Sequence, residues 1–518
     1  MLQGILIFVI FLGPLIFFHE LGHFFFARLF GVKVEVFSIG FGPKILKHVR
    51  NGTEYALSII PLGGYVKMFG DDPFSEVQLT DDEKKVAFNH KSKWARFWIV
   101  FGGPLANLIL AYFLYVGLLT GGEKVPETKV GVVTEKSVLF GKGLRTGDIL
   151  TGINDEKIVS FDDFNIKGSR IDTVKVSRQG QDISLNINMG LEDFIQEFVG
   201  LVSVVKRPVV LNKNNEKFYI SLTQKPTTAM SSFEEISSSF NGTAYLYTYT
   251  MEGDQVKFDY SSESIINASP GMGLVDLLFK MEFYPIDLSV KNVVMSSPAD
   301  KAGLKKGDIL LKLDGQNLKS FEELRQYLQK IEDGKEVKVS YLSKGVEVIK
   351  SVTPEVKVVE KKKTKLIGLE SGVEYLAPKL VTAKAESFGA SLIGAFNRTW
   401  DGILKTFGGY KKLITREVSL NNIGGPLAIG KVASDSFNIS LSMFFRLMAI
   451  ISINLGVINL FPIPVLDGGH IMFLVFETFN RGPLSRRKLE IAQRLGLSLL
   501  FLLLFIALFN DFSRLISL

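Results

Sequence analysis

Four long apolar segments constrain this chain more than any other feature of its sequence. They run over Leu2 to Phe30, Trp98 to Thr120, Met443 to Leu460 and Leu495 to Phe509. Each segment is long enough, or nearly so, for a helix to cross about 30 Å of hydrocarbon. The stretch between Gly121 and Leu441 is polar and has the character of a soluble domain. The sequence therefore predicts a polytopic α-helical membrane protein with four transmembrane helices and a large domain between the second and third.

The first apolar segment could be confused with a cleaved signal peptide. No basic residue precedes the apolar run, and the run contains Glu20, a charge that the core of a signal peptide would not carry. We therefore expect this segment to remain in the mature protein as a helix.

Basic residues gather beside the predicted helices. Lysines and arginines recur between Arg28 and Arg96, and a second cluster lies between Arg481 and Lys488. The positive-inside rule places both clusters in the cytoplasm, so we expect both termini and the 121–441 domain on the opposite side. These clusters account for much of the net charge of +7, which therefore does not indicate a nucleic-acid partner. The absence of cysteine excludes disulfides and thiolate metal ligands.

The first apolar segment contains the H-E-x-x-H sequence that runs from His19 to His23. On a helix the two histidines lie one turn apart on the same face, so both imidazoles can reach one zinc ion. Glu20 then lies beside the metal, where it can take a proton from a water whose pKa zinc lowers to about 7. The alternative is a chance pattern, or histidines that serve as polar groups in a helix bundle. Ionisable residues inside an apolar helix are costly and usually functional, which favours the zinc site.

A catalytic zinc site needs a third protein ligand and one open position. The best candidate is Asp467, which follows the third apolar segment and is itself followed by two glycines. Pro462 and Pro464 must break the helix just before it. The first and third helices are expected to run in the same direction, so Asp467 and the two histidines should lie at similar depth near the cytoplasmic face. By itself, an Asp-Gly-Gly sequence is an ordinary turn.

Together these motifs resemble the site-2 protease family of intramembrane zinc metalloproteases, particularly its bacterial RseP-like branch (regulator of sigma-E protease type). The resemblance extends beyond H-E-L-G-H to five further segments: Val36–Pro43, Ile60–Lys67, Gly102–Asn107, Gly424–Leu427 and Asn459–Gly468. These segments cover most of the membrane portion and its flanks.

The resemblance implies one catalytic Zn²⁺ ion bound by His19, His23 and Asp467, with Glu20 as the catalytic base. It also implies that Asn459, Pro462 and Pro464 help to hold the substrate backbone. Gly40 and Gly42 fall in the part that resembles the family's membrane-associated β-hairpin, which could pair with an unwound substrate by strand addition. A simple turn is the alternative for this glycine cluster.

An internal repeat occupies the polar domain. Gly143–Leu150 reappears as Gly303–Leu310, Ser160-Phe161 matches Ser320-Phe321, and Val174–Ser177 corresponds to Val337–Ser340. Such self-similarity predicts two copies of one module. Short β-branched strands, a G-D-I-L turn and a following helix resemble a PDZ domain. The pair could screen or hold peptides and proteins, or it could act as a rigid spacer.

Two further stretches have more than one interpretation. Residues 195–284 depart from the family pattern and form either an enlarged loop of the first module or a small inserted β-rich piece. Between Ser387 and Leu413, apolar residues recur every three or four positions. This spacing predicts an amphipathic helix, which either rests on the membrane surface or packs under the paired modules.

The expected domain order follows from these features. It is a first transmembrane helix with H-E-x-x-H (1–30), a cytoplasmic membrane-associated β region and linker (31–94), a second transmembrane helix (95–120), a first β-rich PDZ-like domain with an insertion (121–284), a second PDZ-like domain (285–360), a linker and amphipathic helix (361–441), a third transmembrane helix with the L-D-G segment (442–478), and a fourth transmembrane helix (488–512).

The resemblance implies an intramembrane zinc endopeptidase of regulated intramembrane proteolysis, located in a bacterial inner membrane with both termini and the PDZ-like domains in the periplasm. Its expected partners are the lipid bilayer and single-span membrane protein substrates, such as anti-sigma factors, with remnant signal peptides as a second class. One alternative is a catalytically inactive PDZ-bearing membrane scaffold. Another is a membrane protease that cuts exposed loops beside the bilayer.

Overall fold

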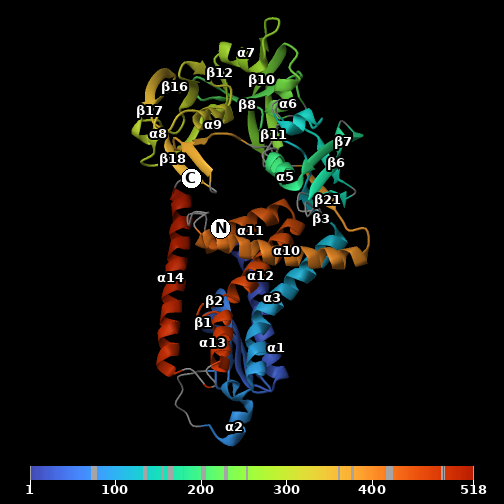
Figure 1. Ribbon diagram of the computed structural model, residues 1–518, viewed down its shortest axis with the longest axis vertical. Coiled ribbons are helices and arrows are strands. Elements are labelled where there is room, and N and C mark those ends of the chain that lie inside the picture. The colour runs from blue at the N-terminus through green and yellow to red at the C-terminus, as the bar shows by residue number, and fades with distance from the viewer. Residues whose placement is uncertain are drawn as a thin grey trace. The chain divides into compact units, whose positions relative to one another are not determined.

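The computed structural model describes residues 2–516 apart from 72–78, 132, 134–136, 155, 161–168, 179, 200–205, 227–231, 253–254, 360–361, 375–378, 416–423, 480–481 and 483–484. The chain divides into two compact units. The first comprises Met1–Val125 with Thr382–Leu518, and the second comprises Pro126–Val381. Figure 1 shows the helices and strands of both units. Phe161 and Arg481, which the sequence analysis used, lie outside the described residues.

Four helices among the described residues are long and apolar enough to cross a membrane. They are α1 (Leu2–Leu29), α3 (Lys93–Gly121), α12 (Leu441–Asn459) and α14 (Arg486–Ile516). The prediction of four such helices is therefore confirmed. Helix α3 contacts α1, α10 and α12, so it lies at the centre of the first unit. The remaining helices of this unit are α2 (Asp81–Val86), η1 (Phe88–His90), α10 (Phe388–Ile414), α11 (Pro426–Ile439) and α13 (Asp467–Phe479).

A β-sheet lies between α1 and α3 in the sequence, where a β region was predicted. It is built from β1 (Val34–Arg50) and β2 (Thr53–Met68). Residues 36–39 of β1 pair on one side with residues 64–67 and on the other side with residues 54–57. Residues 54–57 pair in turn with residues 46–49. The two long strands thus fold into four adjacent segments, and the segment ending at Met68 forms one edge of the sheet.

Helix α10 is amphipathic, as its sequence predicted. Its buried face packs on α3 and α12 through small residues such as Ala395, which has no exposed surface. The opposite face exposes more than half of Ile393, Phe396, Trp400 and Leu404. These four residues follow the three- and four-residue spacing of one helix face.

The second unit contains the two repeat copies as two four-stranded sheets. The first has the order β5-β4-β6-β7 and the second has the equivalent order β15-β14-β16-β17. The first consists of β4 (Ile149–Ile153), β5 (Glu156–Lys157), β6 (Arg170–Arg178) and β7 (Gln181–Gly190). The second consists of β14 (Ile309–Leu313), β15 (Gln316–Asn317), β16 (Val337–Ser343) and β17 (Val346–Val352). The shared order supports the prediction of a duplicated module.

The pairing register corrects one part of the predicted repeat. Ile153 lies opposite Val174 in the first sheet, whereas Leu313 lies opposite Val339 in the second. The structural equivalent of Val174 is therefore Val339, and the sequence match to Val337 was wrong by two residues. A two-residue shift leaves side chains on the same face of a strand. For this reason the alternation of hydrophobic residues along the strand could not reveal the two-residue shift.

Residues 209–285 contribute a separate five-stranded sheet with the order β11-β10-β9-β8-β12. Its strands are β8 (Val209–Asn212), β9 (Lys217–Ser221), β10 (Thr243–Glu252), β11 (Gln255–Asn267) and β12 (Phe283–Pro285). Val210 and Ile220 pack with α6 (Phe233–Ser238) and α7 (Leu274–Lys280) on one face. Val209 and Leu211 point to the other face and join the hydrophobic core of the second repeat copy. The extra sheet therefore shares its core with the second copy.

The shorter elements complete the described structure. They are β3 (Glu123–Pro126), α4 (Val138–Gly141), α5 (Leu191–Val199), η3 (Ile286–Leu288), β13 (Val290–Val293), α8 (Pro298–Lys301), α9 (Phe321–Lys330), β18 (Glu355–Val359), β19 (Lys362–Leu366), β20 (Leu369–Ser371) and β21 (Leu380–Ala383).

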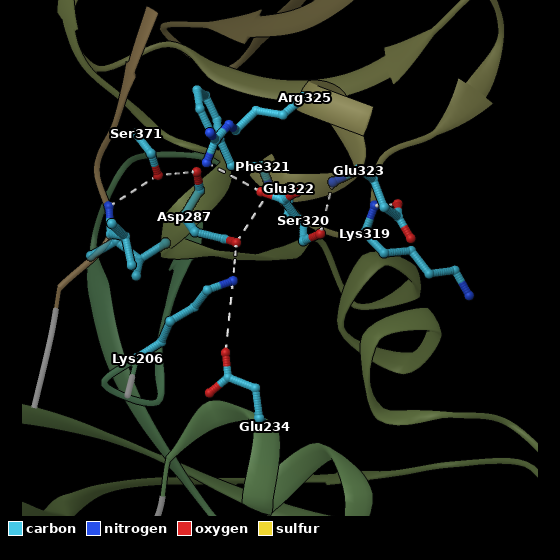
Figure 2. A network of polar contacts seen from close by, with 12 residues as sticks. Lys206, Glu234, Asp287, Lys319, Ser320, Phe321, Glu322, Glu323, Arg325 and Ser371 are labelled. Carbon is cyan, nitrogen blue, oxygen red and sulfur yellow. Dashed lines mark hydrogen bonds and ion pairs between the residues drawn. The ribbon is translucent and has the colours of Figure 1, made fainter. Parts of the chain in front are cut away.

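A polar network ties the extra sheet to the second repeat copy, and Figure 2 shows it from close by. Buried Asp287 accepts a hydrogen bond of 2.7 Å from Lys206 Nζ and one of 3.3 Å from the Phe321 amide. The Ser371 hydroxyl donates to the Asp287 carbonyl at 2.6 Å. Lys206 also lies 3.7 Å from Glu234 Oε1 on α6. Because each buried charge has a partner, the network fixes how these elements meet.

Candidate metal centre

Two histidines of α1 and one aspartate at the start of α13 come together in the first unit. His19 Nε2 lies 3.2 Å from His23 Nε2. Asp467 Oδ2 lies 3.3 Å from His19 Nε2, and Asp467 Oδ1 lies 3.5 Å from His23 Nε2. The structure therefore brings together the three residues that the sequence analysis proposed as metal ligands.

The spacing of these ligand atoms suits a zinc ion. Zinc bonds of about 2.0–2.2 Å in a tetrahedron place neighbouring ligand atoms roughly 3.3–3.6 Å apart. The three observed separations of 3.2, 3.3 and 3.5 Å lie at or close to this range. The donor set of two imidazoles and one carboxylate is also typical of catalytic zinc sites. The residues present therefore fit the metal that the motif predicts.

Asp467 reaches the histidines because the chain turns sharply after α12. Pro462 and Pro464 cannot continue a helix, and α13 begins directly at Asp467. A Cβ atom at Gly468 would overlap the carbonyl oxygens of Leu460 and Phe461. The glycine after the aspartate is thus required by close backbone packing, and the turn holds Asp467 at the site.

Glycines of α3 let that helix approach the two histidines. A Cβ at Gly103 would lie 2.6 Å from His23 Cε1 and 2.8 Å from His19 Cε1. A Cβ at Gly102 would lie 2.7 Å from the Gly22 carbonyl oxygen on α1. All three distances are shorter than normal van der Waals contacts. Only glycine fits at these two positions of α3.

The Nδ1 atom of each imidazole ring, on the side opposite Nε2, contacts α3. His23 Nδ1 lies 2.9 Å from the Ile99 carbonyl oxygen. This bond places the hydrogen on Nδ1 and leaves the lone pair of His23 on Nε2, which faces Asp467. His19 Nδ1 lies 3.3 Å from the side-chain amide of Asn107. Helix α3 therefore contacts both candidate ligands without supplying one itself.

Glu20 of α1 lies against the edge segment of β2. Only 8% of its surface is exposed. A Cβ at Gly64 would lie 2.9 Å from Glu20 Cγ and 2.7 Å from the Ser38 carbonyl oxygen. The absence of a side chain at Gly64 therefore allows the edge segment of β2 to lie directly against Glu20.

The other predicted site residues lie in two places. Asn459 is the last residue of α12, and Pro462 and Pro464 lie in the turn that leads to Asp467. Gly40 and Gly42 lie in the bend of β1 with φ of +89° and +84°, a region that favours glycine. These two glycines shape the sheet, whereas Gly64 is the glycine that contacts Glu20.

Sequence reasoning assigned no role to Gly64, Gly103 or Asn107. Each falls inside a segment that carried the family resemblance, so the segments themselves were the available signal. None of the three is a metal ligand or an acid–base group. Their positions follow only from the packing of α3 and β2 against α1.

Comparison with known proteins gives matches along nearly the whole chain. Residues 7–503 match the profile of peptidase family M50. The regulator of sigma E protease of Haemophilus influenzae is 32% identical over 509 residues, which cover 98% of each chain. The regulator of sigma-E protease RseP of Escherichia coli is 30% identical over 514 residues, again 98% of each chain. A Vibrio cholerae protein whose name describes a zinc metalloprotease is 31% identical over 522 residues and 99% of each chain.

Solved structures give a shorter match. The PDZ domain of the SdrC-like protein from Listeria monocytogenes aligns with 17% of this chain and 87% of its own length, at 26% identity and a TM-score of 0.15.

Proposed function

This chain belongs to peptidase family M50 and is a zinc metalloprotease of the site-2 type, and we propose that it hydrolyses peptide bonds within the transmembrane segments of single-span proteins. One observation carries the proposal. The His-His-Asp group and the buried carboxylate of Glu20 lie on or directly beside helices that are long and apolar enough to span a membrane. Ionisable residues in such helices are costly and mark functional sites.

The proposed roles follow from the chemistry of each group. His19, His23 and Asp467 hold one zinc ion, which supplies Lewis-acid chemistry that polarises a carbonyl and acidifies water. Glu20 takes the proton from the attacking water and delivers it to the leaving amine. Glu20 is buried, with its Cγ close to Gly64 of β2, and this burial would limit the access of bulk water to the carboxylate.

The edge of the β-sheet is the proposed binding surface for an unwound substrate. A helix hides its carbonyl groups in hydrogen bonds, so a transmembrane substrate must unwind before attack. Among the described strands, residues 64–68 pair only with β1 and leave one edge for strand addition. Gly64 lies against Glu20, so a chain paired there would present its carbonyl groups to the base. Asn459, Pro462 and Pro464 would support the substrate from the other side, and Gly40 and Gly42 would keep the bend of β1.

The names of two relatives bear on the substrates. Both the Haemophilus and the Escherichia proteins are called regulators of sigma E. We propose anti-sigma factors as the first substrate class and remnant signal peptides as the second. The two repeat copies of the 126–381 unit would act as PDZ-like modules that hold peptides or exclude substrates whose outer domain is intact.

The proposed location is a bacterial inner membrane. Both termini and the 126–381 unit would lie in the periplasm, with the metal centre near the cytoplasmic side. The exposed apolar face of α10 would rest on the membrane surface. Attachment of a cysteine-specific reagent to single cysteines placed at residues 85 and 305 tests this topology, because the chain has no native cysteine.

Cleavage of a single-span test protein distinguishes the protease from a catalytically inactive PDZ-bearing scaffold. The variants are wild type, Glu20→Gln and, as a matched control, Glu490→Gln, which changes an exposed carboxylate paired with Arg494. Wild type and Glu490→Gln should cut within the span, whereas Glu20→Gln and chelated wild type should not. A zinc-loaded wild type that cuts none of several spans would favour the scaffold. Equal cleavage of a soluble unfolded protein would favour a protease that acts on loops beside the bilayer.

A further inference from the structure

Asn107 carries a buried polar atom for which no described residue provides a hydrogen bond. The residue lies on α3 and is 1% exposed. Its side-chain nitrogen lies 3.3 Å from His19 Nδ1, while its Oδ1 has no hydrogen-bond partner among the described residues. A buried oxygen without a partner costs about 1–3 kcal/mol. The position of the amide nitrogen, in contrast, has a polar neighbour, which is the Nδ1 atom of His19.

The chemistry of His19 identifies that partner. His19 Nε2 faces Asp467 and His23, so a metal would be bound through Nε2. A neutral imidazole that uses the Nε2 lone pair carries its hydrogen on Nδ1 and must donate it. The amide nitrogen of Asn107 cannot accept a hydrogen bond, but the amide oxygen can. A half-turn of the carboxamide exchanges the two atoms with little change in shape, gives the Nδ1 hydrogen of His19 an acceptor and places the amide nitrogen where Oδ1 lies now.

Helix α3 already provides such a hydrogen-bond acceptor to His23. The Ile99 carbonyl oxygen lies 2.9 Å from His23 Nδ1. Ile99 and Asn107 are two helical turns apart on α3, and the histidines are one turn apart on α1. The backbone of Asn107 is held from a third helix, because the Ser452 hydroxyl of α12 donates to its carbonyl oxygen at 2.7 Å. Asn107 therefore contacts α1 through its side chain and α12 through its backbone.

We propose that Asn107 is the positioning residue for His19 and that its amide oxygen accepts the Nδ1 hydrogen of that imidazole. The bond fixes the orientation of the ring and directs the Nε2 lone pair to the metal. Partners of this kind tune ligands, and their loss typically weakens metal binding about 10–100-fold. The inference rests on the proposed zinc site and adds a residue that neither binds the metal nor touches the substrate.

Zinc affinity tests this role without a measurement of activity. The full chain is purified in detergent, and zinc is titrated against a chelator of known affinity. Asn107→Leu should bind zinc about 10–100-fold more weakly than wild type. Asn107→Asp should stay within a few-fold of wild type, because a carboxylate oxygen accepts the same hydrogen bond. Ser452→Ala is the matched control, since it removes a buried hydrogen bond to the backbone of the same residue and leaves the side-chain amide unchanged.

Each outcome decides between alternatives. Weak binding by Asn107→Leu with rescue by Asn107→Asp supports the positioning role. Wild-type affinity in a folded Asn107→Leu variant overturns it, and so does an equal loss in Ser452→Ala, which would indicate general packing. If Asn107→Leu does not fold, Asn107→Ala removes the amide without added bulk and carries the same expectation. Failure of wild type to bind zinc would overturn the proposed function instead.

Discussion

Replacement of Gly103 by alanine should strongly weaken metal binding while the protein stays folded. The added Cβ would lie 2.6 Å from His23 Cε1 and 2.8 Å from His19 Cε1. Carbon atoms in contact are normally at least about 3.5 Å apart, so the two distances are about 0.9 and 0.7 Å too short. Both contacts are to imidazole rings held by hydrogen bonds to α3, and neither ring can move without leaving the metal centre.

The size of the effect follows from these overlaps. Metal–ligand distances tolerate changes of about 0.2 Å, and a displacement of about 1 Å at a reacting group costs about 100-fold in rate. We therefore expect Gly103→Ala to lose at least about 100-fold in cleavage and in zinc affinity. Helix propensity works in the opposite direction, because alanine is favoured over glycine in a helix interior by roughly 0.5–1 kcal/mol. That gain offsets part of the cost of overpacking, about 1–3 kcal/mol.

The assay compares Gly103→Ala with Gly117→Ala on the same helix. A Cβ at Gly117 would have nothing within 4 Å, so this variant should match wild type in zinc affinity and cleavage and should unfold at the same or a slightly higher temperature. Zinc is measured in the purified full chain by chelator competition, and folding is measured by the unfolding midpoint. A Gly103→Ala protein that retains zinc affinity within threefold of wild type would refute the close approach of α3 to the histidines.

Two further predictions concern stability. Buried Asp511 of α14 accepts hydrogen bonds from the amides of Gly425, Leu427 and Ala428 at the start of α11. Asp511→Ala should therefore lower the free energy of unfolding by about 2 kcal/mol in chemical denaturation, whereas Asp435→Ala on the exposed surface of α11 should be neutral. In the second repeat copy, hydrogen bonds from the Tyr327 hydroxyl and the Lys338 amide hold the pKa of Asp314 below its usual value. A lowered pKa adds stability above the unfolded value near pH 4, and this stability is lost as the pH falls through the folded value. Tyr327→Phe should thus lower the unfolding midpoint at pH 6 and have less effect at pH 3, and an equal effect at both pH values would contradict this account.

The closeness of the two candidate histidine ligands could be predicted from the sequence because it depends on short spacing. His19 and His23 are one helical turn apart, so their meeting requires only that the segment be helical. Asp467 was predicted from membrane topology, since two helices that run in the same direction bring their ends to one depth. The order of the four helices required only their apolar length.

The remaining features depend on contacts that no local pattern encodes. The shift that makes Val339, and not Val337, the equivalent of Val174 preserves the alternation of side chains, so the sequence looks the same in either register. The separate sheet of residues 209–285 shares a core with the second repeat copy through Val209 and Leu211, which are ordinary strand residues. Gly64 acquires its role only because β2 folds back onto α1 beside Glu20.

The spacing of residues on α3 explains how a helix without a metal ligand can determine the geometry of the centre. Ile99, Gly103 and Asn107 are separated by four residues each and form one ridge of the helix. The ridge meets α1 in reverse order, because Ile99 contacts His23 and Asn107 contacts His19. Position 103 must lack a side chain for the two imidazole rings to fit. Ile99 and Asn107 must each offer a hydrogen-bond acceptor that holds one ring. Loss of the Asn107 side-chain amide should loosen His19 alone, whereas a side chain at Gly103 should displace both histidines.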